Sequence, residues 1–135
     1  MRRINFIILH CSATKEGVNV TVNDIDRWHK ERGFTKIGYH FVIYLDGSIH
    51  KGRPIEEIGA HCKGRNSDSI GICYIGGLDK SGKPKDTRTP AQKEAILKLL
   101  RTLKEKFPDV EIRSHRDFAN KDCPCFDATS EYKNI

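Results

Sequence analysis

Two histidines and a cysteine stand where a fold could bring their side chains together around a metal ion. His10 follows the apolar run Phe6–Leu9, and His115 follows a short apolar stretch near the far end of the chain. Cys123 comes eight residues after His115. Two imidazoles and one thiolate would give zinc three protein ligands and leave a fourth position for water, which is the arrangement of catalytic zinc sites.

Spacing by itself does not select this ligand set. The chain has six histidines and five cysteines, and a single histidine is more often a surface or hydrogen-bonded residue than a ligand. His10 and His115 are 105 residues apart, and the interval from His115 to Cys123 matches no diagnostic metal motif. The residue types therefore indicate a metal site without deciding which side chains form it.

The elements that must position these side chains alternate between strands and helices, which predicts one α/β sheet covered by helices. Asp46-Gly47 is a turn signal, so the apolar runs on either side should pair as a hairpin. Thr89, Pro90 and Gln92 form a capping box with proline at the first helical position, which marks the start of a helix. We expect strands over residues 3–9, 38–44, 48–51, 70–75 and 110–113, and helices over residues 22–32 and 90–107.

Composition excludes several classes of protein. The 135 residues include 24 Lys and Arg against 18 Asp and Glu, a formal charge of +6. A chain of this length buries roughly two-thirds of its unfolded surface, so we expect one domain over residues 1–135 that needs no disulfides to fold. The longest unbroken aliphatic or aromatic run is Phe6–Leu9, far below the roughly 18 residues of a membrane-spanning helix. We expect no membrane span.

Export and nucleic-acid binding are also disfavoured. Asn5 and His10 bracket only four apolar residues, whereas a secretory signal needs an apolar core of about 7 to 15. We therefore expect no signal peptide and synthesis in the cytoplasm, where reduced thiols or a metal ligand are favoured over disulfides for an odd number of cysteines. Zinc-finger spacing and RNA-binding aromatic motifs are absent and the basic residues are spread along the chain, so we expect no nucleic-acid partner.

Five segments, taken in order, carry a resemblance that covers nearly the whole chain. They are residues 9–14 (LHCSAT), 38–41 (GYHF), 59–64 (GAHCKG), 66–72 (NSDSIGI) and 114–124, which ends in KDCP. In this combination the sequence resembles the type 2 N-acetylmuramoyl-L-alanine amidases, the family that includes the lysozyme-type phage endolysins and the peptidoglycan recognition proteins. The resemblance implies a mixed sheet of about five strands flanked by helices, with a zinc site at one edge of the sheet.

The same resemblance implies the metal and the residues that assist it. It implies that His10, His115 and Cys123 bind one Zn²⁺ per chain, and that Tyr39 and Lys121 assist the chemistry at the edge of the metal. The substrate it implies is peptidoglycan or a muropeptide, cleaved between the lactyl group of N-acetylmuramic acid and L-alanine of the stem peptide. We expect the protein to act as a monomer.

Three further residues match family positions that line the substrate cleft. They are His61, Asn66 and Ser69. A structural hydrogen bond is the alternative role for His61. His40 alternates with Tyr39 along the expected strand, so if Tyr39 faces the metal, His40 faces away and is structural.

The residue types suit hydrolysis of an amide. Bound zinc would polarise the lactyl carbonyl and lower the pKa of its water to about 7. Lys121 would donate charge-assisted hydrogen bonds to the developing oxyanion. Tyr39, with an ordinary pKa near 10, suits orienting water or donating a hydrogen bond better than acting as a base. No Glu lies in the matched segments as an obvious general base, which leaves the proton donor to the leaving amine unassigned.

Two acidic or thiol side chains near the expected ligands have alternative roles. Asp117, two residues after His115, could orient a ligand imidazole or be a solvated surface acid. Cys125 stands where the family usually has a small residue after Cys-Pro, and puts a second thiol two positions from Cys123. It could compete for zinc or pair with Cys123 after metal loss.

Two other functions stay open from the sequence. One is a non-catalytic peptidoglycan-binding module, although such relatives typically lack the cysteine ligand and this chain keeps Cys123 together with Tyr39 and Lys121. The other is a cytosolic amidase that recycles muropeptides. A chain without an export signal fits that role as well as it fits an endolysin that reaches the cell wall through a holin pore or by lysis.

Overall fold

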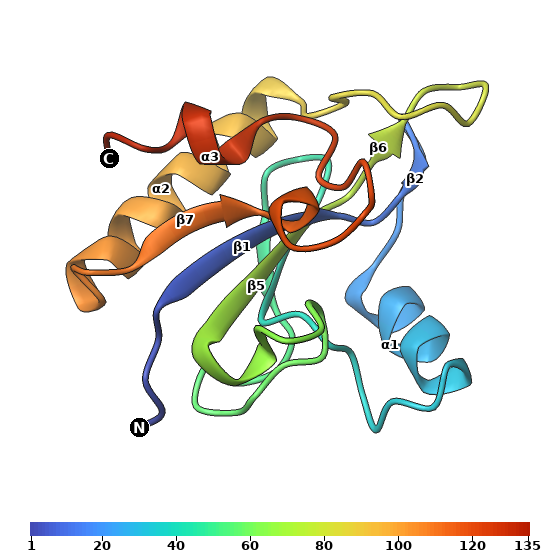
Figure 1. Ribbon diagram of the computed structural model, residues 1–135. Coiled ribbons are helices and arrows are strands. Elements are labelled where there is room, and N and C mark those ends of the chain that lie inside the picture. The colour runs from blue at the N-terminus through green and yellow to red at the C-terminus, as the bar shows by residue number, and fades with distance from the viewer.

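A mixed five-stranded β-sheet forms the centre of the computed structural model, which describes residues 1–135. The strand order is β4-β3-β5-β1-β7, and only the β3–β4 pair is antiparallel (Figure 1). This confirms the predicted mixed sheet and the hairpin around Asp46-Gly47. The strands are β1 (Phe6–Cys11), β3 (Phe41–Ile43), β4 (Ile49–Lys51), β5 (Ser69–Tyr74) and β7 (Glu111–Ser114).

Three α-helices and two 3-10 turns complete the fold. Helix α1 (Val22–Glu31) begins at a capping box of Thr21 and Asp24, and α2 (Pro90–Lys106) begins at the predicted box of Thr89 and Gln92. Both boxes satisfy backbone N–H groups that a helix start leaves unpaired. The remaining elements are α3 (Ala128–Glu131), η1 (Asn66–Asp68) and η2 (His115–Asp117).

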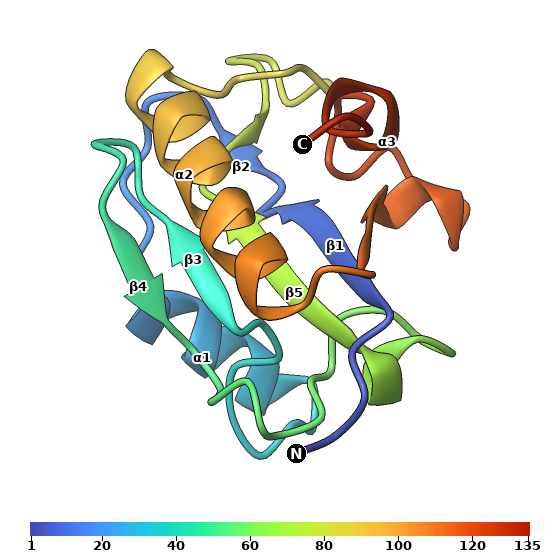
Figure 2. The same ribbon diagram turned by 90° about the vertical axis from the view of Figure 1, so that its left-hand side faces the viewer.

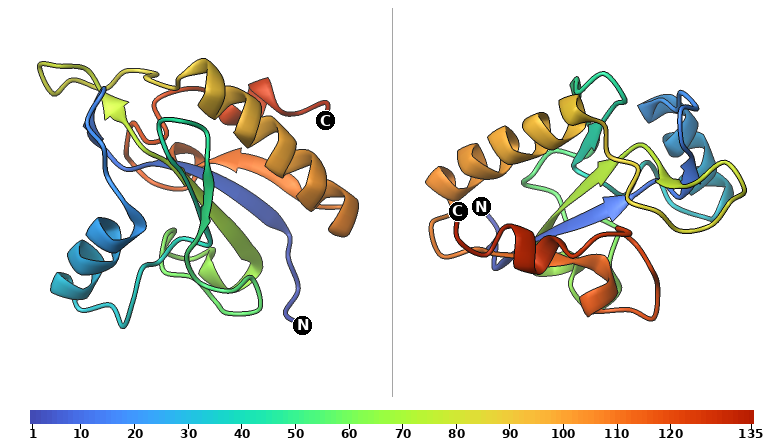
Figure 3. Two further views of the ribbon diagram at one scale, coloured as in Figure 1. Left: turned by 180° about the vertical axis from the view of Figure 1, so that it is seen from behind. Right: turned by 90° about the horizontal axis from the view of Figure 1, so that it is seen from above.

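The two faces of the sheet pack against different helices. Helix α2 crosses one face, where its Ile96 and Leu100 join a cluster of 17 buried residues (Figure 2). Helix α1 lies on the other side, where Ile25 packs with Val42 and Ile75 in a cluster of five. Figure 3 shows the same layering from behind and from above. The sheet thus has a fully covered face and a partly covered one.

The alternation of side chains along β1 assigns His10 to the partly covered face. Ile7, Leu9 and Cys11 belong to the cluster beneath α2. Because successive side chains of a strand point to opposite faces, Ile8 and His10 point away from α2. His10 therefore faces the side of the sheet that α1 covers only in part.

Several features were not predicted from the sequence. Two short strands, β2 (Thr14–Lys15) and β6 (Gly77–Leu78), pair in a second, parallel sheet. The expected strand over residues 38–44 is shorter, since only Phe41–Ile43 joins the sheet. The segment after β7, where no helix was predicted, contains η2 and α3. No helix of the structure is both long enough and apolar enough to cross a membrane.

A buried arginine fastens the segment after β7 to the rest of the molecule. The Arg88 side chain is only 2% exposed and pairs with Asp86 and Glu131. It also donates to the Tyr132 hydroxyl at 2.8 Å, and its guanidinium lies 3.3 Å from the ring centroid of Phe126. These contacts hold α3 and the preceding loop against the large core cluster.

Candidate metal centre

The fold brings His10, His115 and Cys123 together. His10 lies near the carboxyl end of β1, and His115 directly follows β7. Because β1 and β7 are parallel neighbours with Leu9 opposite Ser114, the two histidines are adjacent, and their ring centroids are 4.3 Å apart. Nδ1 of His10 lies 3.9 Å from Sγ of Cys123. One donor atom from each residue lies within 4.8 Å of the others, so this group could hold a metal ion.

The chemistry of the three donors fits zinc. Nδ1 of His115 is buried without a hydrogen-bond partner, which a metal would supply. In a tetrahedral zinc site, ligand distances near 2.0 and 2.3 Å put a nitrogen and a sulfur about 3.6 Å apart, close to the 3.9 Å between His10 and Cys123. Burial lowers the pKa of His10 well below its usual range and that of His115 to about 4. Both imidazoles are therefore neutral at pH 7, with lone pairs to donate.

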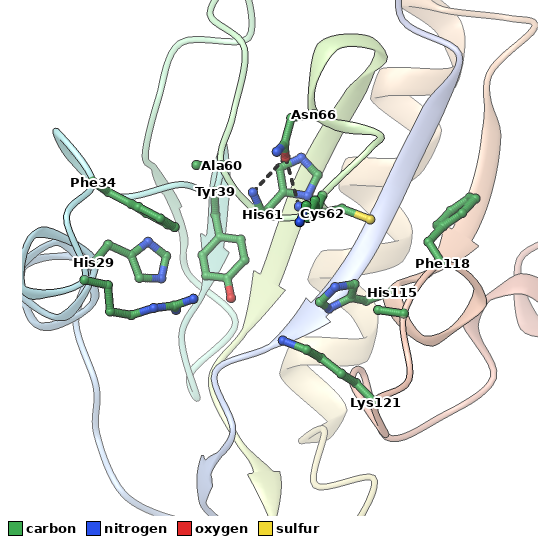
Figure 4. Close-up of a pocket in the computed structure, with 13 residues that line it drawn as sticks. His29, Phe34, Tyr39, Ala60, His61, Cys62, Asn66, His115, Phe118 and Lys121 are labelled. Atoms are coloured by element: carbon green, nitrogen blue, oxygen red, sulfur yellow. Dashed lines mark hydrogen bonds between the residues drawn. The ribbon is translucent and has the colours of Figure 1, made fainter.

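A cleft of about 640 Å³ opens beside this group. Its lining includes Tyr39, His115 and Lys121 (Figure 4). A second cavity of about 240 Å³ shares these three residues and reaches Cys123. The two predicted assisting side chains thus lie where the clefts meet next to the candidate ligands, from segments on opposite sides of the cleft.

Helix α1 helps to position Tyr39 through its residue His29. Nδ1 of His29 accepts the backbone N–H of Gly38 at 2.9 Å, and the His29 and Tyr39 rings are 5.3 Å apart between centroids. Burial raises the pKa of Tyr39 well above its usual range. Its hydroxyl therefore stays protonated and can donate a hydrogen bond.

The cleft is cationic. Among its 13 lining residues, Arg32, Lys63 and Lys121 are basic and none is Asp or Glu. Arg32 and Lys63 were not singled out from the sequence, because a surface Lys or Arg has no local pattern that distinguishes a cleft from open solvent. The absence of carboxylates also means that the cleft offers no Glu as a general base, as the matched segments indicated.

The three residues expected at the substrate cleft cluster around one imidazole. Nδ1 of His61 lies 2.8 Å from Nε2 of His10, and Nε2 of His61 lies 3.1 Å from Oγ of Ser69. Asn66 accepts the backbone N–H groups of His61 and Cys62 on its side-chain oxygen, as Figure 4 shows. His61 and Asn66 line the cleft, whereas Ser69 is fully buried.

Two other side chains have structural partners. His40 lies outside β3, and its Nδ1 accepts the backbone N–H of Gly71 at 3.0 Å while its Nε2 lies 2.9 Å from the Glu57 carbonyl oxygen. Asp117 contacts no imidazole. Its carboxylate accepts from Arg113, from the backbone of Ser114 and from Thr129, and so caps the turn that carries His115.

The second thiol, Cys125, lies beside Cys11. Its Sγ is 3.9 Å from Sγ of Cys11. Its backbone φ is 69°, in the left-handed region that favours glycine. Burial and the neighbouring Cys11 raise the pKa of the Cys125 thiol to about 12, so it is protonated at pH 7.

Residues 1–126 match the family model of N-acetylmuramoyl-L-alanine amidase. The chain belongs to this family. It is 46% identical to the endolysin of Klebsiella phage KP32 over 121 residues, which are 90% of this chain and 80% of that protein. Family membership and this similarity make the protein a peptidoglycan amidase.

Solved structures of the family have the same fold. The N-acetylmuramoyl-L-alanine amidase LysC of Clostridium intestinale superposes with a TM-score of 0.82 at 32% identity, covering 96% of this chain and 82% of LysC. A variant of Drosophila PGRP-LB in complex with tracheal cytotoxin superposes with a TM-score of 0.83 at 26% identity, covering 99% of this chain and 82% of that one. These solved structures thus share the overall fold of this chain.

Proposed function

We propose that residues 1–135 form a single zinc-dependent catalytic domain that cleaves the amide between the lactyl group of N-acetylmuramic acid and L-alanine of the stem peptide. The observation that carries this proposal is the convergence of three metal-binding side chains from distant parts of the chain at one wall of a cationic cleft. The proposed ligands of one Zn²⁺ per chain are His10, His115 and Cys123.

The roles of the chain's own residues follow from their positions. When bound, zinc would act as a Lewis acid toward the scissile carbonyl and lower the pKa of water. Lys121 lies in both cavities, where its ammonium can stabilise negative charge developing on the carbonyl oxygen. Tyr39, protonated and close to His10, donates a hydrogen bond that orients the water or the carbonyl.

The cleft suits an anionic stem peptide. Stem peptides carry free carboxylates, and Arg32 and Lys63 line the cleft without any competing acid. The partner we propose is therefore peptidoglycan or a soluble muropeptide, bound by a monomer. We further propose that the protein is made in the cytoplasm and acts on the cell wall after release, like an endolysin.

Product analysis tests this function. The zinc-loaded protein is incubated with purified peptidoglycan, and newly exposed amino groups and reducing sugar ends are labelled separately. We expect new N-terminal alanine without new reducing ends, and no product from a Cys123→Ala variant. New reducing ends would identify a glycosidase, and wall binding without either product would identify a non-catalytic recognition module.

A further inference from the structure

A buried hydrogen-bonded chain connects the candidate metal centre to the start of β5. His61 lies between His10 on one side and Ser69 on the other, at 2.8 and 3.1 Å. His10 is 1% exposed and Ser69 is fully buried. Both ring nitrogens of His61 are thus engaged by the protein, which leaves neither of them free for a substrate.

The contacts assign the direction of these hydrogen bonds. Nδ1 of His10 is the nitrogen that faces Cys123, so in a metal site it needs its lone pair. A neutral imidazole carries one proton, which must then be on Nε2 of His10, where it is donated to Nδ1 of His61. His61 in turn carries its proton on Nε2 and donates to the Ser69 hydroxyl.

The backbone around His61 is built to hold this ring. Gly71 lies in the interior of β5, and a Cβ atom there would come within 2.6 to 2.8 Å of three ring atoms of His61. Glycine in a strand often marks such a close approach. On the other side, Asn66 fixes the loop by accepting the N–H groups of His61 and Cys62 at 2.8 and 2.9 Å. Gly71 and Asn66 together therefore define the position of the His61 ring.

We propose that His61 is a positioning residue that fixes the tautomer and orientation of His10 for metal binding, with Ser69 and Asn66 holding His61. The inference rests on the proposed ligation of zinc by His10. Partners of ligand imidazoles raise the basicity of the ligand, and their loss typically weakens metal binding or activity about 10- to 100-fold. In this account Ser69 supports the metal centre instead of contacting the glycan or stem peptide.

Two amide substitutions distinguish the roles of the two ring nitrogens of His61. In His61→Asn the side-chain oxygen can occupy the position of Nδ1 and still accept from His10. In His61→Gln the amide reaches the position of Nε2 and leaves His10 without its acceptor. We expect His61→Asn to keep zinc affinity within about threefold of the native protein, and His61→Gln and His61→Ala to weaken it about 10- to 100-fold. Affinity is measured by competition with a chromophoric chelator.

His50→Asn is the matched control, because His50 lies in β4, stacked on Tyr44, away from the ligands. If native protein fails to bind one zinc, the proposed function fails. If native protein binds zinc and His61→Ala and His61→Gln bind it equally well, only the positioning role is wrong, and a rise in KM for peptidoglycan would then assign His61 to substrate contact.

Nitrogen-15 NMR of the zinc-loaded native protein tests the same inference without any substitution. We expect His61 to carry its proton on Nε2 and His10 to carry its own on Nε2. A proton on Nδ1 of His61 would reverse the hydrogen bond and overturn the proposal.

Discussion

The ring of Tyr39 lies 5.0 Å from the ring of His10, centroid to centroid, and is tilted by 54°. The two residues come from different segments, since His10 belongs to β1 and Tyr39 lies in the segment that precedes β3. Tyr39 thus places its ring beside the candidate metal centre without being one of the proposed metal ligands. This separation makes the two roles testable one at a time.

Removing the hydroxyl in Tyr39→Phe should lower kcat and leave zinc binding unchanged. A single hydrogen bond contributes about 0.5 to 1.5 kcal/mol, so we expect a fall of up to about tenfold. Steady-state kinetics on a soluble muropeptide and elemental analysis of the purified variant provide the two measurements. Loss of zinc from Tyr39→Phe would show that the ring supports the ligands instead.

Lys121 and Lys63 line the same cleft but should affect different kinetic parameters. If Lys121 stabilises the developing oxyanion, Lys121→Ala lowers kcat about 10²- to 10³-fold. Lys63→Ala, its matched control, should mainly raise KM, because a distant cation contributes to binding in the ground and transition states alike. Equal effects of the two variants on kcat would contradict the role given to Lys121.

Cys123→Ala should lose both zinc and activity. Cys125→Gly is its control, since it removes the neighbouring thiol and puts glycine at a left-handed backbone position. We expect Cys125→Gly to keep stoichiometric zinc and full activity. If Cys123→Ala still binds one zinc, Cys125 becomes the candidate third ligand, and the double variant decides between them.

Acid should destabilise the protein in part through His40. Burial lowers the pKa of His40 to about 4, whereas an unfolded histidine titrates near 6.5. Between these values the unfolded state binds more protons, so this stabilisation is complete above pH 6.5 and is lost as the pH falls toward 4. The loss amounts to about 3 kcal/mol at most.

His40→Asn tests this pH dependence, because its side-chain oxygen can still accept the N–H of Gly71 that His40 accepts. Denaturant unfolding is followed at several pH values between 4 and 7.5. The slope of stability against pH should be shallower in the variant than in the native protein, and identical slopes would exclude His40 as a contributor.

The sequence predicted the elements whose signals are local. The capping box at Thr89 and the Asp46-Gly47 turn are formed by neighbouring residues, and both are present in the structure. The two-residue strands β2 and β6 could not be predicted, because they exist only where the fold brings Thr14 and Gly77 together.

The candidate site also has parts that the sequence indicated and parts that it did not. Resemblance indicated the ligands, and the parallel register of β1 and β7 makes His10 and His115 neighbours. The contacts of His61 with His10 and Ser69 depend on three segments meeting, so no spacing encodes them. One signal was present: Gly71 interrupts an apolar strand, which indicates that another group approaches the backbone there.

Two contacts that fasten the loop carrying Cys123 involve no proposed metal ligand. The Tyr74 hydroxyl donates to the carbonyl oxygen of Pro124 at 2.6 Å, and Arg88 ties the following segment to the core. Small domains that depend on a structural metal unfold when it is removed, whereas these two contacts hold the loop without using a metal ligand. We therefore expect that the proposed zinc can be removed and restored without refolding of the chain, so that zinc supply, and not folding, would set when the enzyme is active.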